Sequence, residues 1–125
     1  MRGAILDTGA LVGFERNDRR VVAIVARALE HNDTLVVPAG VVGQAWRDGA
    51  RQARLARLLG SPLCEIVALD DRRAREAGQL CGVAQTSDVI DASVVVVARE
   101  RDARVITSDP DDLRQLDRHI DLVAI

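Results

Sequence analysis

Short apolar runs alternate with longer segments of helical periodicity along the whole 125-residue chain. This alternation is typical of a parallel β-sheet covered by helices, because each parallel strand needs a crossover, usually a helix, before the next strand begins. A chain of this length forms one domain, so we expect residues 1–125 to make a single α/β domain. The segments expected to be strands are Gly3–Asp7, Thr34–Val37, Glu65–Val67, Arg104–Thr107 and Asp121–Ala124.

Helices are expected between these strands. The hardest segment to assign is the apolar run Val94–Val97, since four β-branched residues in a row favour a strand. We favour a helix, because the segment is long enough for three turns, ends in charged residues and precedes a strand as a crossover does; apolar on nearly all sides, it would be a buried helix. The expected helices are residues 20–30, 38 to about 47, 50–59, 70 or 71 to about 80, and 91–102.

Composition excludes several classes of protein. No apolar run reaches membrane-spanning length, and Met1-Arg2-Gly3 leads into a strand instead of a signal peptide, so we expect a cytoplasmic protein. Cys64 and Cys81 are too few for a disulfide framework and belong to no metal-binding motif, so we interpret both as reduced packing residues. His31 and His119 are interpreted as surface or capping residues without a functional role.

Three aspartates stand at the ends of apolar segments. Asp7 follows Ala4-Ile5-Leu6, Asp91 opens an apolar run, and Asp109 follows Val105-Ile106-Thr107-Ser108. Ligands bind at the carboxyl edge of an open parallel sheet, and a right-handed crossover starts its helix at that edge, so all three can meet there. Carboxylates that converge repel one another unless a cation lies between them, and hard divalent cations prefer such oxygen ligands. The alternative interpretation is helix capping for all three, or a turn for Asp109.

The same residues resemble the motifs of a known family. Three segments are similar in order and spacing to the motifs of the PIN-domain nucleases: the N-terminal Asp7-Thr8-Gly9-Ala10-Leu11, the pair Asp91-Ala92 that opens a helix, and Thr107-Ser108-Asp109. The length of the chain is similar to that of the VapC-type toxins of toxin–antitoxin pairs. The resemblance implies a three-layer α/β/α sandwich with strand order 3-2-1-4-5.

It also implies an Mg²⁺- or Mn²⁺-dependent endoribonuclease acting on tRNA or rRNA, held inactive by a cognate antitoxin and usually a homodimer. Asp7, Asp91 and Asp109 would then be the catalytic, metal-binding acids. Thr8 or Thr107 would orient a water molecule or a carboxylate through its hydroxyl group.

One position departs from the family pattern. The family usually has a glutamate on the helix after the second strand, where this chain has Gln44. An amide brings no negative charge and cannot act as a base, so another acid is needed to complete the site. The candidates are Asp88, Asp112 and Glu15, each of which is otherwise a surface acid. The departure favours an alternative function, a catalytically weakened or inactive domain that binds RNA or protein.

A third class is a signalling domain such as a receiver-like fold, which also groups acids at strand ends. We rank it low, because the chain has no lysine and no acidic pair follows its first strand.

All 17 basic residues are arginine, which suits phosphate binding without demonstrating it. In a continuous helix Arg47, Arg51, Arg54 and Arg57 would line one face and could bind RNA; a solvated surface explains them equally well. For Trp46 we prefer a role in core packing to a role in stacking on a base. The apolar stripe of residues 20–30 and the leucines of 55–59 form a hypothetical groove for an antitoxin helix.

Overall fold

The computed structural model describes residues 3–125, so Met1 and Arg2 of the expected N-terminal segment lie outside it. Its five strands form one sheet with the order β3-β2-β1-β4-β5, and every pairing is parallel. The expected strand order is therefore confirmed, and each strand lies within one residue of its predicted bounds. The strands are β1 (Ala4–Leu6), β2 (Leu35–Pro38), β3 (Cys64–Val67), β4 (Arg104–Thr107) and β5 (Leu122–Ala124).

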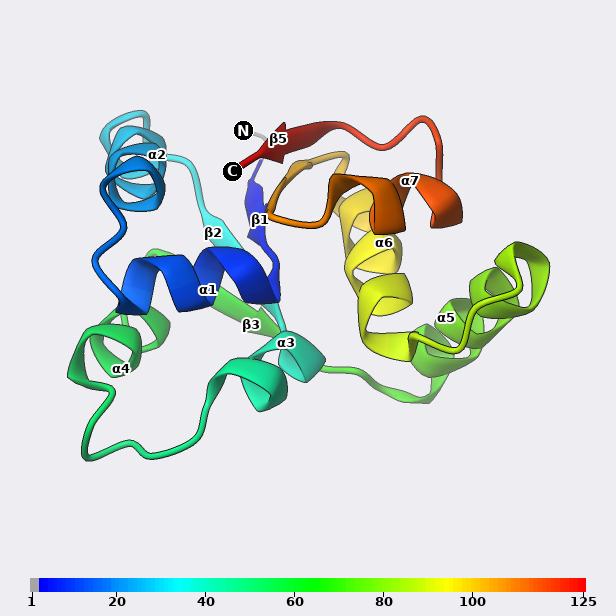
Figure 1. The fold of residues 1–125 in the computed structure, drawn as a ribbon, viewed down its shortest axis with the longest axis horizontal. Helices are drawn as coiled ribbons and strands as arrows, with labels where there is room; N and C mark the ends of the chain where they lie inside the picture. The colour runs from blue at the N-terminus through cyan, green and yellow to red at the C-terminus, as the bar shows by residue number, and fades with distance from the viewer. Residues whose placement is uncertain (1–2) are drawn as a thin grey trace.

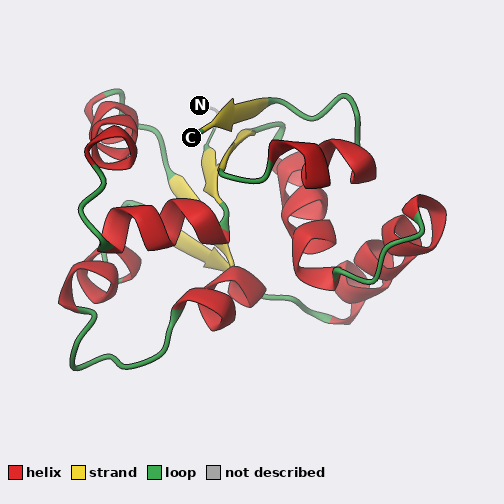
Figure 2. Cartoon of the chain, in the orientation of Figure 1, coloured by secondary structure: helices red, strands yellow, loops and turns green. Residues whose placement is uncertain are grey.

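The helices lie on both sides of the sheet, which confirms the α/β/α architecture (Figures 1 and 2). In Figure 1 one side carries α1, α2 and α4, the other carries α5, α6 and α7, and α3 lies near the end of the sheet. The helices of the described residues are α1 (Thr8–Glu15), α2 (Arg19–Glu30), α3 (Ala39–Ala45), α4 (Ala53–Leu59), α5 (Asp71–Ala84), α6 (Val89–Arg101) and α7 (Pro110–Leu116).

The valine run is helical, as predicted, and occupies the centre of the molecule. Val94, Val95, Val96 and Val97 are at most 3% exposed, and α6 contacts β1, β2 and β4. All three residues of β1 are fully buried as well. A parallel sheet covered on both faces needs such continuous apolar strands, so the apolar runs of the sequence specify the centre of this sheet.

Several helices differ from their expected bounds. Helices α1 and α7 were not predicted, because α1 contains two glycines and no polar stripe and α7 is only seven residues long. The two helices expected at 38 to about 47 and at 50–59 are present as α3 and α4, but the break between them is longer than expected and spans residues 46–52. Helix α5 continues to Ala84 and is closed by Gln85, whose left-handed φ of 58° ends the helix.

Other expectations of the sequence hold in the described residues. Both cysteines are free. His31 caps the end of α2, with 2.7 Å between its Nδ1 atom and the carbonyl oxygen of Arg27. Within residues 3–125 no single helix is long and apolar enough to cross a membrane; α5 and α6 meet that criterion only together, across a 112° bend.

Candidate functional site

Five aspartates line one cavity of about 510 Å³ at the carboxyl ends of β1 and β4. The sheet order explains their meeting, because β1 and β4 are neighbours and an acid follows each of them, Asp7 directly after β1 and Asp109 two residues after the end of β4. The three predicted acids are thus brought together, and Asp88 and Asp112 join them, whereas Glu15 does not line the cavity. The lining residues are Asp7, Thr8, Gly9, Val12, Gln44, Arg47, Asp88, Asp91, Asp109 and Asp112.

Asp7 is held rigidly at the floor of the site. It is 2% exposed, and its Oδ1 atom accepts a hydrogen bond of 2.7 Å from the N–H group of Thr8, so it caps α1 as well as facing the cavity. Its Oδ2 atom accepts a bond of 2.8 Å from the hydroxyl group of Thr107. The same hydroxyl oxygen accepts the N–H group of Asp109 at 2.9 Å. Thr107 therefore fixes the carboxylate of Asp7 relative to the backbone of Asp109.

The environment of Asp7 opposes its negative charge. Burial raises the pKa of this carboxyl group above its usual value, and the charges of Asp109 and Asp88 raise it further. The hydrogen bonds from Thr107 and Thr8 act in the opposite direction. A buried carboxylate whose nearest charges are negative is stabilised by any cation that enters the cavity.

Asp91 does not open its helix, contrary to the prediction. Helix α6 begins at Val89, and Asp88 caps it by accepting the N–H group of Asp91 at 2.9 Å. The capping role proposed as the alternative for Asp91 therefore belongs to Asp88, and Asp91 lies in the first turn with its side chain on the cavity. Burial, followed by the charges of Asp88 and Asp7, raises the pKa of Asp91 to about 7.

Asp109 occupies the N-cap position of α7, but its side chain makes no capping hydrogen bond. Pro110 starts the helix instead, since its fixed φ suits the first position and no donor is lost there. Close packing of α1 sets the place of this segment: a Cβ atom at Gly9 would lie 1.9 Å from the Oγ atom of Ser108. Glycine is unfavourable inside a helix, and that is the sequence signal that identifies Gly9 as a position of close approach.

Gln44, on α3, lines the cavity together with the acids. Its Oε1 atom accepts a hydrogen bond of 2.5 Å from the hydroxyl group of Thr8. The amide oxygen therefore links α3 to the start of α1. Thr8 orients this amide, whereas Thr107 orients a carboxylate, so the two threonines of the sequence hypothesis have different partners.

The four arginines considered for RNA binding do not share one helix face, because residues 46–52 interrupt the helix that would align them. Only Arg47 of the four lines the acidic cavity. Arg51 pairs with Asp48 at 3.6 Å, while Arg54 binds Asn17 and lies over the ring of Phe14 on another face. Arg57 lines that second face as well.

Trp46 is not a core residue, contrary to the prediction. It is 39% exposed and packs against the backbone at Gly49, where a Cβ atom would lie 2.7 Å from its ring. Glycine at this position therefore lets the chain turn closely around the indole, and the loop carries an accessible aromatic ring beside Arg47.

The donors of the cavity suit a hard divalent cation by their chemistry. They are carboxylate, amide and hydroxyl oxygens, and the described part of the chain brings no histidine or cysteine to the cavity. In their present positions no three acidic, histidine or cysteine side chains of residues 3–125 are arranged closely enough to hold an ion. Asp88, Asp109 and Asp112 are exposed and so have room to turn toward one.

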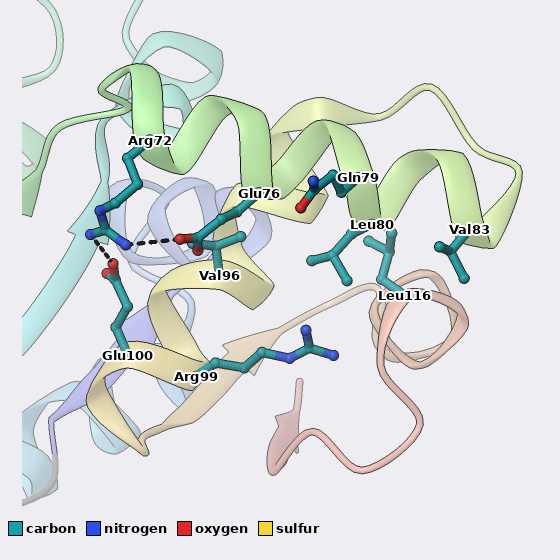
Figure 3. Close-up of a pocket in the computed structure, with 9 residues that line it drawn as sticks. All are labelled: Arg72, Glu76, Gln79, Leu80, Val83, Val96, Arg99, Glu100 and Leu116. Atoms are coloured by element: carbon teal, nitrogen blue, oxygen red, sulfur yellow. Dashed lines mark hydrogen bonds and ion pairs between the residues drawn. The ribbon is translucent and has the colours of Figure 1, made fainter.

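A larger cavity of about 660 Å³ lies between α5, α6 and α7 (Figure 3). Its charged residues all have ion-pair partners: Arg72 binds Glu76 at 2.9 Å and Glu100 at 2.7 Å, and Arg99 binds Asp117, outside the lining, at 2.9 Å. Its remaining wall includes Leu80, Val83 and Leu116. Unlike the acidic cavity, it contains no uncompensated charge, so the acidic cavity is the candidate site.

A family model described as PIN domain matches residues 4–119 of this chain. A search of curated proteins gave no match.

Among solved structures the chain resembles VapBC2 from Rickettsia felis bound to a promoter DNA fragment, with 14% identity, a TM-score of 0.72 and coverage of 97% of each chain. It also resembles a toxin–antitoxin complex from Klebsiella pneumoniae (15% identity, TM-score 0.71, 98% of this chain and 97% of that one). A third is VapC20 from Mycobacterium tuberculosis, described as a sarcin-ricin loop cleaving toxin (12% identity, TM-score 0.66, 88% and 94%). At these identities the likeness is one of fold.

Proposed function

This chain belongs to the PIN-domain family, and from that premise we propose that it is a metal-dependent endoribonuclease that acts in the cytoplasm. The reaction is hydrolysis of an RNA phosphodiester bond. The observation that carries the proposal is the acidic cavity, in which Asp7, Asp91 and Asp109 converge with Asp88 and Asp112.

The acids of the cavity have the chemistry to hold Mg²⁺ or Mn²⁺. Asp7, Asp91 and Asp109 are the proposed ligands, with Asp88 and Asp112 as further acids that compensate for the missing glutamate. A bound divalent ion supplies positive charge against the scissile phosphate and lowers the pKa of water. The raised pKa values of Asp7 and Asp91 support this assignment, because both carboxyl groups lack a compensating cation.

The remaining polar residues orient the site. Thr107 donates to Asp7 and accepts the backbone of Asp109, which keeps these two acids in a fixed relation. Thr8 donates to Gln44 and so holds α3 against α1. In this proposal the two threonines are positioning residues, since each acts through the group that it binds.

We propose structured RNA of the tRNA or rRNA class as the substrate. The support is the fold shared with a toxin described as cleaving the sarcin-ricin loop. We further propose that the protein is the toxin of a type II toxin–antitoxin pair, inhibited by a cognate antitoxin, and that it forms a homodimer. The shared fold of two toxin–antitoxin complexes supports the antitoxin.

RNA cleavage in Mg²⁺ or Mn²⁺ tests the proposed function. We expect the wild-type protein to cleave tRNA or rRNA, and Asp7→Asn and Asp91→Asn each to lower the rate at least about 100-fold, because each loses a ligand of the ion. Asp71→Asn, which removes an 80% exposed acid on α5, is the matched control and should cleave normally. Equal activity of wild type, Asp7→Asn and Asp91→Asn would refute the proposal.

Gln44 favours the alternative function, a domain with weakened or lost catalysis that binds RNA or protein. The same assay separates the two, because Gln44→Glu restores the acid that the family pattern expects. A large gain of activity or metal affinity in Gln44→Glu would indicate a weakened site. No gain, in an active wild type, indicates a site rebuilt around the amide.

A further inference from the structure

The loop between α3 and α4, residues 46–52, is organised by one buried side chain. Gln52 is 7% exposed, although it lies in a segment whose other members are exposed. Its Oε1 atom accepts the N–H groups of Arg47 at 2.7 Å and Asp48 at 2.8 Å, and its Nε2 atom donates to the carbonyl oxygen of Ala45 at 2.9 Å. All of its hydrogen-bonding partners here are backbone groups at the start of the loop.

Burial of an amide is unfavourable unless its hydrogen bonds are made, so these bonds fix the loop in one conformation. Gln52 also occupies the N-cap position of α4 without capping that helix. Its side chain instead reaches back to the end of α3. The conformation that it maintains is the one that presents Arg47 to the acidic cavity.

Arg47 is a cation that the acids of the cavity do not neutralise. Its Nη1 atom donates to the carbonyl oxygens of Gly43 at 2.9 Å and Trp46 at 2.7 Å, so these two contacts are with the backbone. No ion pair within residues 3–125 involves Arg47, whereas Arg51 of the same loop pairs with Asp48. A guanidinium group has five N–H donors, and most of those of Arg47 remain available.

The amide at position 44 helps to keep this guanidinium group available. Gln44 and Arg47 line the same cavity and are three residues apart. A glutamate at position 44 would compete for the guanidinium group as an ion-pair partner. The amide does not, and its oxygen is already bound by Thr8.

We propose that residues 46–52 form a nucleotide-binding loop, in which Arg47 binds an RNA phosphate at the edge of the acidic cavity and Gln52 is the positioning residue. The inference deepens the proposed function and rests on it for the identity of the ligand. The carboxylates of the five aspartates repel a phosphate that enters the cavity. A guanidinium group at the edge offsets this repulsion, because it binds the phosphate through bidentate hydrogen bonds. Trp46, next to Arg47 and exposed, lies where the bound strand would pass.

The chain supplies its own probe for this binding. Trp46 is the single tryptophan and there is no tyrosine, so its emission reports on the loop alone. We would titrate Asp7→Asn protein, which should not cleave, with a single-stranded oligouridylate of roughly eight nucleotides in Mg²⁺ buffer, a length within the usual range of site sizes. Affinity and its dependence on salt are measured with Arg47→Gln, Arg47→Lys and, as the control, Arg75→Gln added to this background.

We expect Arg47→Gln to weaken binding about 5- to 10-fold and to lower the slope of log affinity against log salt by about 0.7, as for loss of one phosphate contact on a single strand. Arg47→Lys keeps the charge and should retain the slope. Arg75→Gln, the control, removes a 79% exposed arginine of α5 and should leave both quantities unchanged. Binding by Arg47→Gln with the affinity and slope of its parent, or no binding by the parent, would overturn the proposal.

A double-mutant comparison tests Gln52. We expect Gln52→Leu to lose affinity and salt slope as Arg47→Gln does, and the double variant to lose little more, because both changes remove the same contact. If Gln52→Leu does not fold by circular dichroism, Gln52→Met replaces it, since this unbranched side chain adapts to the same space and also lacks the amide. Additive losses, or a folded Gln52 variant that binds normally, would contradict the positioning role.

The two proposals fail separately. Cleavage by wild type with no effect of Arg47→Gln on binding refutes the nucleotide-binding loop and leaves the ribonuclease proposal intact. Arg47-dependent binding without cleavage by wild type refutes the ribonuclease and leaves the binding loop.

Discussion

Asp91 shows how the chemistry of the site depends on single residues. It is half-buried, and the groups that affect it most after burial are the carboxylates of Asp88 and Asp7. Burial and like charge both favour its protonated form, so in the absence of a cation the folded protein is destabilised whenever Asp91 ionises. The same ionised carboxylates that can bind a cation therefore lower the stability of the folded protein when no cation is bound.

Asp91→Asn should therefore stabilise the protein at neutral and alkaline pH. The pKa of Asp91 is raised from 3.8 to about 7 by folding, so the destabilisation is complete above pH 7 and disappears as the pH falls toward 4. We expect a gain on the order of 1 kcal/mol at pH 8, a value reduced for the partial exposure of the group. Urea unfolding in EDTA at pH 8 and pH 4.5 measures it.

The control for this prediction is Asp111→Asn, since Asp111 is 99% exposed and outside the cavity. It should give no gain at either pH. An Asp91→Asn gain that is equal at both pH values would show that relief of charge repulsion is not its cause.

At this scale the sequence predicts which acids meet but not what each one binds. Asp7, Asp91 and Asp109 could be selected because each stands at the end of an apolar run. The sequence could not show that Asp88, and not Asp91, caps α6, because either aspartate is a good N-cap and the choice depends on where α6 starts. Gln52 had no signal in the sequence, since its partners are backbone groups of a loop.

Among the elements, those with strong apolar patterns were predicted best. Strands β1, β2 and β4 and helix α6 are specified by runs of buried residues, whereas the edge strands β3 and β5 are mostly half-buried or exposed. Helix α1 was missed because it is apolar on most sides and contains glycines, and the break between α3 and α4 was predicted shorter than it is because helical spacing continues into it. The break depends on Gln52 and on the packing of Trp46 against Gly49, which are tertiary contacts.

The groove predicted for an antitoxin helix needs a correction at this scale. The stripe of α2 and the leucines of α4 are largely in the core, since Val21, Val25 and Leu55 are at most 2% exposed. What remains accessible is a cavity of about 320 Å³, lined by Phe14, Leu29 and Leu58 with Arg54, Arg57 and Ser61. We therefore propose this smaller apolar surface, edged by arginines, as the antitoxin site.

Hydrogen exchange of the complex with the cognate antitoxin tests this surface. We expect the amides of α2 and α4 to exchange more slowly in the complex than in the free protein, because a helix docked there covers both. Helix α5, on the other side of the sheet in Figure 1, is the internal control and should exchange at the same rate in both. Unchanged exchange in α2 and α4 would exclude the surface.

For the whole molecule, the sheet order collects residues that are far apart in the chain. Asp7 and Asp109 meet because β4 returns to pair with β1. The alternation of apolar runs predicts a parallel sheet, but strand order does not follow from it; the order came from the family resemblance. The central claim is that this arrangement makes the acids of several elements one divalent-cation site.

Calorimetric titration with Mn²⁺ at pH 7.5 tests that claim most directly, since it requires neither RNA nor catalysis. We expect wild type and the Asp111→Asn control to bind Mn²⁺ alike, and Asp7→Asn and Asp91→Asn each to bind at least about tenfold more weakly, because each removes a charged ligand from one shared site. If Asp7→Asn and Asp91→Asn both bound Mn²⁺ as tightly as wild type, or if wild type bound no Mn²⁺, the acids would not form one divalent-cation site.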